Sequence, residues 1–219
     1  MRILSKINLI ITLLLFSILF SCKNNPTNPS ASASFYPVVV GNNWEYNYIE
    51  YDSLGIITNE KTIKESLIHY RIKDGLMVFQ IYSPLNPKSP LCCDYRYYLE
   101  NKIDGIHYLI SSDSLGYWVT DNLLYKYPCS QNEFFTYGRN DHDTTFVISI
   151  DDTILCKAGT YSCIVYENKI KDLDGNTIGY INTYVAYGIG KVKYEVYLYD
   201  SKPQLYKSLE YTLINYNLN

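Results

Sequence analysis

The fold is decided by residues 148–200, which read ISIDDTILCKAGTYSCIVYENKIKDLDGNTIGYINTYVAYGIGKVKYEVYLYD. Near the end of this stretch two sets of side chains alternate: one set is Val192, Tyr194, Val196 and Leu198, and the other is Lys191, Lys193, Glu195 and Tyr197. A period of two is typical of a β-strand with one buried face. The pattern therefore predicts a half-buried antiparallel strand at the C-terminal end of the stretch.

The same stretch contains three turn signals and no room for helices. Residues 180–187 are rich in Tyr, Ile, Val and Thr, and only Gly188, Ile189 and Gly190 separate them from the strand that follows. Further turns are predicted at 172–176 and at 157–160. A parallel pair of strands needs a crossover of about a dozen residues or more, and these gaps are too short. The stretch is predicted to be a four-strand antiparallel meander.

The rest of the chain continues this pattern of strands and turns. Tyr accounts for 25 of 219 residues, and Tyr favours strands, where it can face core or water. Further strands are predicted at 36–51, 58–72, 76–82, 95–100, 106–111, 115–127, 134–137, 144–155 and 204–215. We expect an all-β antiparallel meander of about ten to twelve strands with little helix. Its apolar face must be covered, and we favour a sheet curled into a half-barrel or barrel over two stacked sheets.

The N-terminus has the layout of an export signal. Arg2 and Lys6 precede residues 7–20, which are apolar apart from Asn8, Thr12 and Ser17. A spanning helix needs roughly 20 apolar residues, so this run is short for one. It ends in residues 19–22, Leu-Phe-Ser-Cys, which resemble the lipobox of bacterial lipoproteins. That resemblance implies cleavage after residue 21 and acyl chains on Cys22, which would hold the protein on a membrane.

Residues 22–34 are predicted to be the lipidated Cys and a flexible tether, followed by a single all-β domain at 35–219. The tether is rich in Asn, Pro, Ser and Ala and shows no apolar periodicity. Lys23 does not resemble an inner-membrane retention signal, and the tether lacks the acidic pairs of some surface-displayed lipoproteins. We therefore expect an outer-membrane lipid anchor on the periplasmic side, with surface display as the alternative.

Three short motifs resemble those of a large group of uncharacterised bacterial lipoproteins. Residues 36–46 are similar to its "YP, GNxWxY" opening, residues 158–161 to its "AGT(F/Y)" hairpin, and residues 187–195 to its "GxGxV" turn. The motifs occur in the group's order and span nearly the whole mature chain. Lys157 stands where the group often has Pro. The resemblance implies a curved antiparallel sheet similar to those of periplasmic lipoprotein carriers, and it implies no activity.

Charge argues against a nucleic-acid partner. Without residues 1–21 the basic residues fall from 19 to 17 against 22 acidic ones, a net charge of about −5 with no basic stripe. Phosphate binding requires clustered Lys and Arg. The expected partners are instead the membrane, through the N-terminal lipid, and either an apolar ligand or an envelope protein.

The cysteines predict disulfides in an oxidising compartment. Besides Cys22 there are five: Cys92, Cys93, Cys129, Cys156 and Cys163. Cys156 and Cys163 flank the turn at 158–161 and are the first predicted pair, and Cys92 or Cys93 with Cys129 is the second. One thiol remains over. No two of these cysteines show the spacing of a zinc or thioredoxin-like motif, so no metal site is expected.

No motif predicts catalysis or a cofactor. His69, His107 and His142 lack a convergent partner in the sequence, and we expect packed or surface roles for them. The acidic residues at 172–176 lack the later ligands of a calcium loop. Residues 188–190 lack the third Gly and the helix of a nucleotide loop. We therefore expect no catalytic residues, no metal and no cofactor.

The aromatic residues leave three functions open. A concave sheet lined by aromatic side chains could hold an acyl chain or a sugar, and the candidate residues are Trp44, Tyr46, Tyr48, Tyr184 and Tyr194. The same residues could equally be core. We favour a structural or interaction role at the envelope, with a binding or carrier module for an apolar ligand as the alternative. A hydrolase of envelope glycans or peptides is third. Whether the concave side is filled or open would discriminate between the first two.

Overall fold

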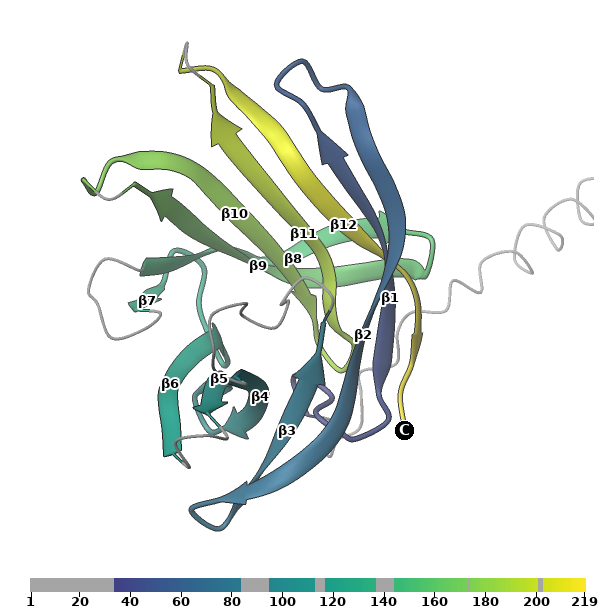
Figure 1. The fold of residues 1–219 in the computed structure, drawn as a ribbon, viewed down its shortest axis with the longest axis vertical. Helices are drawn as coiled ribbons and strands as arrows, with labels where there is room; N and C mark the ends of the chain where they lie inside the picture. Colours follow the sequence, from purple (N-terminus) through teal and green to yellow (C-terminus); the bar gives the residue numbers. More distant parts are fainter. Residues whose placement is uncertain (1–33, 84–94, 113–116, 137–143, 173, 201–202) are drawn as a thin grey trace, which may run out of the picture. The chain divides into compact units, whose positions relative to one another are not determined.

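The computed structural model describes residues 34–83, 95–112, 117–136, 144–172, 174–200 and 203–219. Residues 34–219 form one compact unit. Its described part contains twelve strands and no helix (Figure 1). The strands are β1 (Asn43–Tyr51), β2 (Ile57–Lys73), β3 (Leu76–Tyr82), β4 (Tyr95–Lys102), β5 (Gly105–Ser112), β6 (Tyr117–Lys126), β7 (Phe134–Thr136), β8 (Thr144–Cys156), β9 (Gly159–Lys171), β10 (Thr177–Ala186), β11 (Gly190–Tyr199) and β12 (Leu205–Asn217).

All strands belong to one antiparallel sheet that curls into a nearly closed barrel, which confirms the predicted fold class. The order is β6-β5-β4-β3-β2-β1-β12-β11-β10-β9-β8-β7. Two meanders, β1 to β6 and β7 to β12, are therefore joined where the first strand pairs with the last. In that pair Tyr46 lies opposite Leu213 and Tyr48 opposite Tyr211. The sheet's two edges, β6 and β7, are consecutive in the chain but do not pair, and they flank the one gap in the order.

Alternation along β1 builds the core. Trp44, Tyr46 and Tyr48 are buried, whereas Asn43, Glu45 and Asn47 between them are partly exposed. The three aromatic residues share the inner face of the sheet, as the sequence pattern predicts. They join one large core cluster that also includes Ile63, Leu67, Val147, Tyr166 and Leu213.

The first strand begins later than predicted, at residue 43 rather than 36, because residues 35–42 contact the ends of several strands instead of pairing along one. The Phe35 carbonyl accepts a hydrogen bond from Gly188 N–H, and the Phe35 ring stacks on Tyr127. The Tyr36 ring lies between those of Trp44 and Tyr125, with centroids 5.7 and 6.0 Å away. Gly190 makes room for it, since a Cβ there would lie 2.9 Å from the Tyr36 ring.

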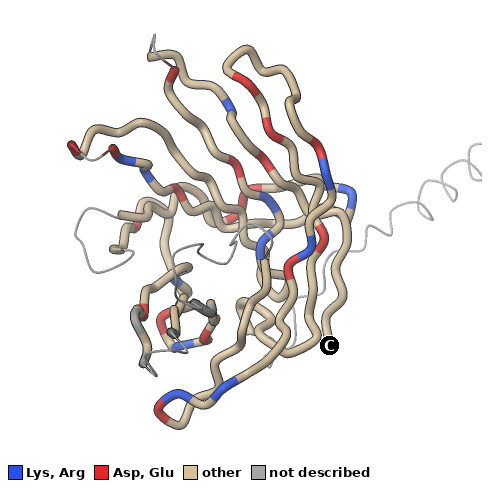
Figure 2. The backbone as a smooth tube through the Cα atoms, viewed as in Figure 1, with Lys and Arg blue, Asp and Glu red and all other residues tan. Residues whose placement is uncertain are grey.

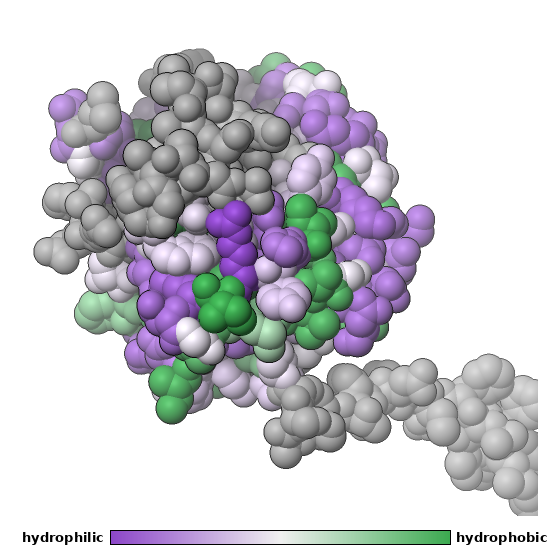
Figure 3. Space-filling view, turned by 60° about the horizontal axis from the view of Figure 1, so that its bottom comes forward, coloured by the Kyte–Doolittle hydropathy of each residue, from purple (hydrophilic) through white to green (hydrophobic). Residues whose placement is uncertain are grey.

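The outer surface is of mixed polarity. Lys and Arg are interspersed with Asp and Glu along the strands (Figure 2). Apolar residues reach the surface in small groups between hydrophilic ones (Figure 3). In the described residues no helix is long and apolar enough to cross a membrane.

Candidate functional site: a cavity inside the barrel

The interior of the barrel contains a cavity of about 490 Å³. Eight strands and the segment before β1 contribute to its wall. Six of the described lining residues are tyrosines: Tyr36, Tyr48, Tyr108, Tyr125, Tyr194 and Tyr211. Aliphatic residues form the rest of the apolar wall: Ile81, Leu99, Leu124, Val196 and Leu209. The described side chains therefore leave part of the concave side of the sheet unfilled.

One polar group of residues interrupts this wall. Lys191 Nζ lies 3.0 Å from Glu65 Oε1 and 2.9 Å from Glu65 Oε2, and Ser83 Oγ donates to Oε1 at 2.9 Å. Lys191 also donates to the Tyr211 hydroxyl at 2.9 Å. Both Glu65 and Lys191 are buried. A buried ion pair of this kind requires close geometry and further hydrogen bonds to offset the cost of desolvation.

Tyrosine rings surround the ammonium group of Lys191. Its Nζ lies 4.7 Å from the centroid of Tyr211, 5.5 Å from that of Tyr46 and 6.0 Å from that of Tyr194. Ring faces attract a cation at such distances. Burial is the largest single influence on the pKa of Lys191 and lowers it, but the adjacent Glu65 carboxylate and the neighbouring tyrosines together raise the pKa above its ordinary value. Lys191 is therefore charged inside the barrel.

Burial keeps three tyrosines of the wall, Tyr36, Tyr125 and Tyr211, as neutral phenols. Burial raises the pKa of Tyr36 to about 12 even though Lys191 opposes the shift. Burial also raises the pKa values of Tyr125 and Tyr211 well above their ordinary value. Glu65 and Lys191 are consequently the charged pair among the described lining residues, and the wall has no net charge.

A β-bulge explains why Lys191 points inward although strict alternation places it with the polar set. In β10, Tyr184 pairs with Lys193 but Val185 pairs with Lys191, so Val192 is the extra residue. A bulge changes which face of a sheet the following side chain meets. The alternation in the sequence therefore placed Lys191 on the outer face and did not indicate its position in the cavity wall. Glu65 was also missed, although its position between the buried Ile63 and Leu67 on the period of two was a usable signal.

A second cavity of about 450 Å³ lies toward the unpaired edges of the sheet. Leu124, Tyr125 and Tyr194 line both cavities, and Thr144, Asn168 and Lys169 line the second one. These three shared residues lie between the interior cavity and the second cavity, which is next to β6, β8 and β9. This second space therefore adjoins the interior cavity on the side where the barrel does not close.

The five aromatic residues singled out from the sequence lie in three different places. Tyr48 and Tyr194 line the cavity. Trp44 and Tyr46 are fully buried beside it, where Trp44 Nε1 donates to the Ile189 carbonyl at 2.6 Å and the Tyr46 hydroxyl to the Lys191 carbonyl at 3.1 Å. Tyr184 is not among the lining residues; it pairs with Lys193, and its hydroxyl donates to Glu195 at 2.8 Å.

Glu195, the hydrogen-bond partner of Tyr184, gives a prediction about acid stability. Burial disfavours its charged form, but hydrogen bonds from Lys207, Lys193 and Tyr184 outweigh burial and lower its pKa from 4.5 to about 2. At pH values between these two pKa values the unfolded chain binds more protons than the folded chain. The folded state therefore loses stability as the pH falls from about 5 to about 2. We expect this group to contribute about 2 kcal/mol, since its two lysines are partly exposed.

Urea unfolding at a series of pH values tests this expectation. Glu195→Gln should lower stability at neutral pH and flatten the decline below pH 5, whereas Glu60→Gln, at an exposed position, should leave the curve parallel to that of the parent. If the free energy of unfolding falls with pH equally steeply in the parent and in Glu195→Gln, the Glu195 carboxylate is not the group that causes the loss of stability in acid.

The structure does not show the predicted Cys156–Cys163 bridge. Cys129, Cys156 and Cys163 are free thiols. Cys156 in β8 lies opposite Gly159 in β9, and Cys163 in β9 lies opposite Asp152 in β8. The position opposite Cys156 is therefore four residues from Cys163 along β9. Four residues of extended strand span roughly 13 Å, which is too far for a disulfide. The prediction placed them on adjacent strands correctly but did not include the register. Cys22, Cys92 and Cys93 lie outside the described residues.

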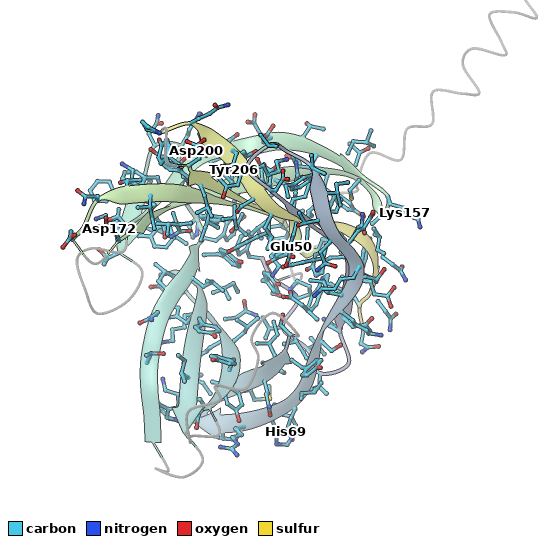
Figure 4. The ribbon with its side chains drawn as sticks, turned by 45° about the horizontal axis from the view of Figure 1, so that its top comes forward. Glu50, His69, Lys157, Asp172, Asp200 and Tyr206 are labelled. Atoms are coloured by element: carbon cyan, nitrogen blue, oxygen red, sulfur yellow. The ribbon has the colours of Figure 1, made fainter. Side chains whose placement is uncertain are left out.

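The remaining candidates do not converge on a site. His107 contacts Asp121 and Asp104 at 2.8 and 3.0 Å, and His142 lies outside the described residues. The Asp172 carboxylate accepts hydrogen bonds from the backbone of Asp174 and Asn176, which is the geometry of a turn. Figure 4 shows His69 and Asp172 at well separated parts of the barrel. Among the described residues no group of three or more His, Cys, Asp or Glu could hold a metal ion.

Fold and cavity together define an antiparallel β-barrel whose described interior is lined by tyrosines and contains the buried Glu65–Lys191 ion pair. No family model and no curated protein matches the chain. The solved structures similar to this chain include two proteins whose nature is itself inferred, one described as an exported protein and the other as a lipoprotein. One is an exported protein with a YmcC-like fold from Bacteroides fragilis, with 13% identity, 84% of this chain and 99% of that chain covered, and a TM-score of 0.47. The other is a lipoprotein from Parabacteroides distasonis, with 14% identity, 84% and 99% covered, and a TM-score of 0.43. Similarity at this level assigns no function to this chain.

Proposed function

We propose that this protein is a non-catalytic binding module that holds a small, mainly apolar molecule inside its barrel. The single observation that carries the proposal is the interior cavity of about 490 Å³. Cavities of about 300–1,000 Å³ lined by aromatic and aliphatic groups, with a few placed polar groups, are typical of small-molecule sites. A barrel with a purely structural role would fill its interior to ordinary packing density. The cavity therefore favours the binding alternative over the structural role that the sequence favours.

The lining residues give less support to a hydrolase. Glycan hydrolysis by the usual route needs two carboxyl groups facing the bond that is cleaved. Among the described residues of the wall, Glu65 is the one carboxylate, and it is paired with Lys191. No histidine is among those residues, so a His-carboxylate pair is not present there either.

Filling the cavity tests the proposal. Val196 lines it, and Val196→Phe would project extra volume into open space rather than into packed core. We expect the parent to bind the neutral apolar dye N-phenyl-1-naphthylamine with a rise in fluorescence, and Val196→Phe to weaken that binding at least about tenfold. The full chain carrying Cys22→Ser is suitable, because no attached acyl chain can then compete.

Leu205→Phe is the matched control, since Leu205 is 44% exposed in β12. It adds similar volume outside the barrel and should bind the dye like the parent. Equal affinity in all three proteins would place the dye on the surface and count against an interior site. A parent protein that binds no dye, and retains no small molecule in a native mass spectrum, would remove the basis of the proposal.

We also propose that the module is held at the outer membrane, facing the periplasm, by acyl chains on Cys22. The support comes from the signal-like residues 7–20 and the lipobox-like residues 19–22. We expect metabolic labelling with an alkyne fatty acid to mark the parent, and Cys22→Ser to lose the label and leave the membrane fraction. Cys163→Ser is the control for labelling at another cysteine. A label that persists in Cys22→Ser would contradict the proposed anchor.

A further inference from the structure

The polar group in the cavity wall has two hydrogen-bonding positions that the described residues leave open. Glu65 Oε2 is buried and accepts no hydrogen bond from them, although Lys191 Nζ lies 2.9 Å away. The Tyr211 hydroxyl accepts from Lys191, and the described residues provide no acceptor for its own proton. One open acceptor and one open donor therefore lie close together, both in residues that line the cavity.

A hydroxyl or a carboxamide matches these two positions. Either group can donate to Glu65 and at the same time accept from Tyr211. A buried polar group with an unfilled hydrogen-bonding position is costly, so a ligand that fills both positions gains affinity beyond the burial of its apolar part.

Charge balance disfavours ionised ligands. The wall already contains one negative and one positive group at 2.9 Å from each other, and no further charge among the described residues. A carboxylate would add a second negative charge beside Glu65 and could not donate to it. An ammonium group would add a second positive charge beside Lys191. Lys169 and Lys171 line the second cavity but are exposed to solvent, which screens them from the interior.

We propose that the cavity selects neutral molecules with an apolar body and one hydroxyl or carboxamide group over acids and amines with the same body. The selection is made by Glu65, Lys191 and Tyr211. This inference rests on the proposed binding function and names the ligand class for that site.

A set of probes with one chain length tests it: 1-decanol, decanamide, decanoate and decylamine. Each probe competes with N-phenyl-1-naphthylamine on the full chain carrying Cys22→Ser. We expect decanol and decanamide to displace the dye at concentrations at least about tenfold lower than decanoate or decylamine, because the charged probes must be desolvated beside a like charge. Decanoate that binds as tightly as decanol would overturn the inference.

A change of selectivity in a variant distinguishes this mechanism from simple exclusion of charge by an apolar cavity. Glu65→Gln leaves Lys191 without its counter-charge, so the preference for decanol over decanoate should fall at least about tenfold. Glu195→Gln, which removes a buried carboxylate outside the cavity, should keep the parent's preference. If Glu65→Gln does not fold, the double variant with Glu65→Gln and Lys191→Gln replaces it. Decanoate then no longer lies beside the negative charge of Glu65, so the preference for decanol over decanoate should still narrow.

The outcomes separate the two proposals. An unchanged preference in folded Glu65→Gln, or in the double variant, overturns the role of the ion pair but leaves an interior binding site intact. Failure of all four probes to displace a dye that binds inside the barrel also overturns the selection. A dye that does not bind inside the barrel defeats the binding function itself.

Discussion

Lys191→Met is expected to lower the free energy of unfolding by about 3–5 kcal/mol, because it leaves Glu65 as an uncompensated charge inside the barrel. Ser83 would remain as a hydrogen-bond donor to Glu65 at 2.9 Å, but a hydroxyl does not replace a cation. Domains of this kind are stable by about 5–15 kcal/mol, so the loss would be a large fraction of the total. Urea unfolding followed by circular dichroism measures it.

Two companion variants show whether the loss comes from the unpaired charge. Glu65→Leu combined with Lys191→Met removes both charges and should recover most of the stability. Lys193→Met is the matched control two residues away, outside the cavity wall, where Glu195 keeps its contact with Lys207 at 2.6 Å. We expect it to cost about 1 kcal/mol or less. If Lys191→Met costs no more than Lys193→Met, Glu65 is solvated and the pair is not a buried one.

The fold was predictable because the information for it is local. Alternation along residues 192–198 and the three turns between 148 and 200 depend only on neighbouring residues, and the structure places strands β8 to β11 accordingly. Trp44, Tyr46 and Tyr48 share one face for the same reason. Antiparallel pairing followed from the short turns, and curling followed from the need to cover one apolar face of a single sheet.

The candidate site was harder to predict because it depends on pairing between distant strands. Glu65 and Lys191 are 126 residues apart and meet only because β1 pairs with β12 and the sheet then curls. The bulge opposite Val185 reverses the face of Lys191, and no local pattern indicates it. Tyr184 was singled out for its residue type, but its register with Lys193 puts it outside the cavity wall. Likewise, the register of β8 and β9 separates two cysteines that the sequence places on either side of one turn.

Trp44→Ala is the other substitution expected to have a large effect, about 3–5 kcal/mol of unfolding free energy. Trp44 is fully buried in β1, and its Nε1 donates to the Ile189 carbonyl, in the turn between β10 and β11, at 2.6 Å. Its ring also packs against Tyr36, which lines the cavity. Loss of the indole should therefore destabilise the fold and, in the folded fraction, weaken binding of N-phenyl-1-naphthylamine. Urea unfolding and dye titration measure the two effects.

Trp44→Phe separates packing from the hydrogen bond. It keeps most of the apolar volume but removes the donor to Ile189, so we expect a loss of about 1–2 kcal/mol, smaller than that of the alanine variant. Phe134→Ala is the control for removing a large aromatic ring, since Phe134 is 66% exposed at the edge strand β7 and should change stability by less than about 1 kcal/mol. The turn after β10 positions Gly190 beside Tyr36 and Lys191 beside Glu65. A Trp44→Ala variant as stable as Phe134→Ala would mean that contacts other than the Trp44 side chain hold this turn in place. The cavity wall would then not depend on the link between β1 and that turn.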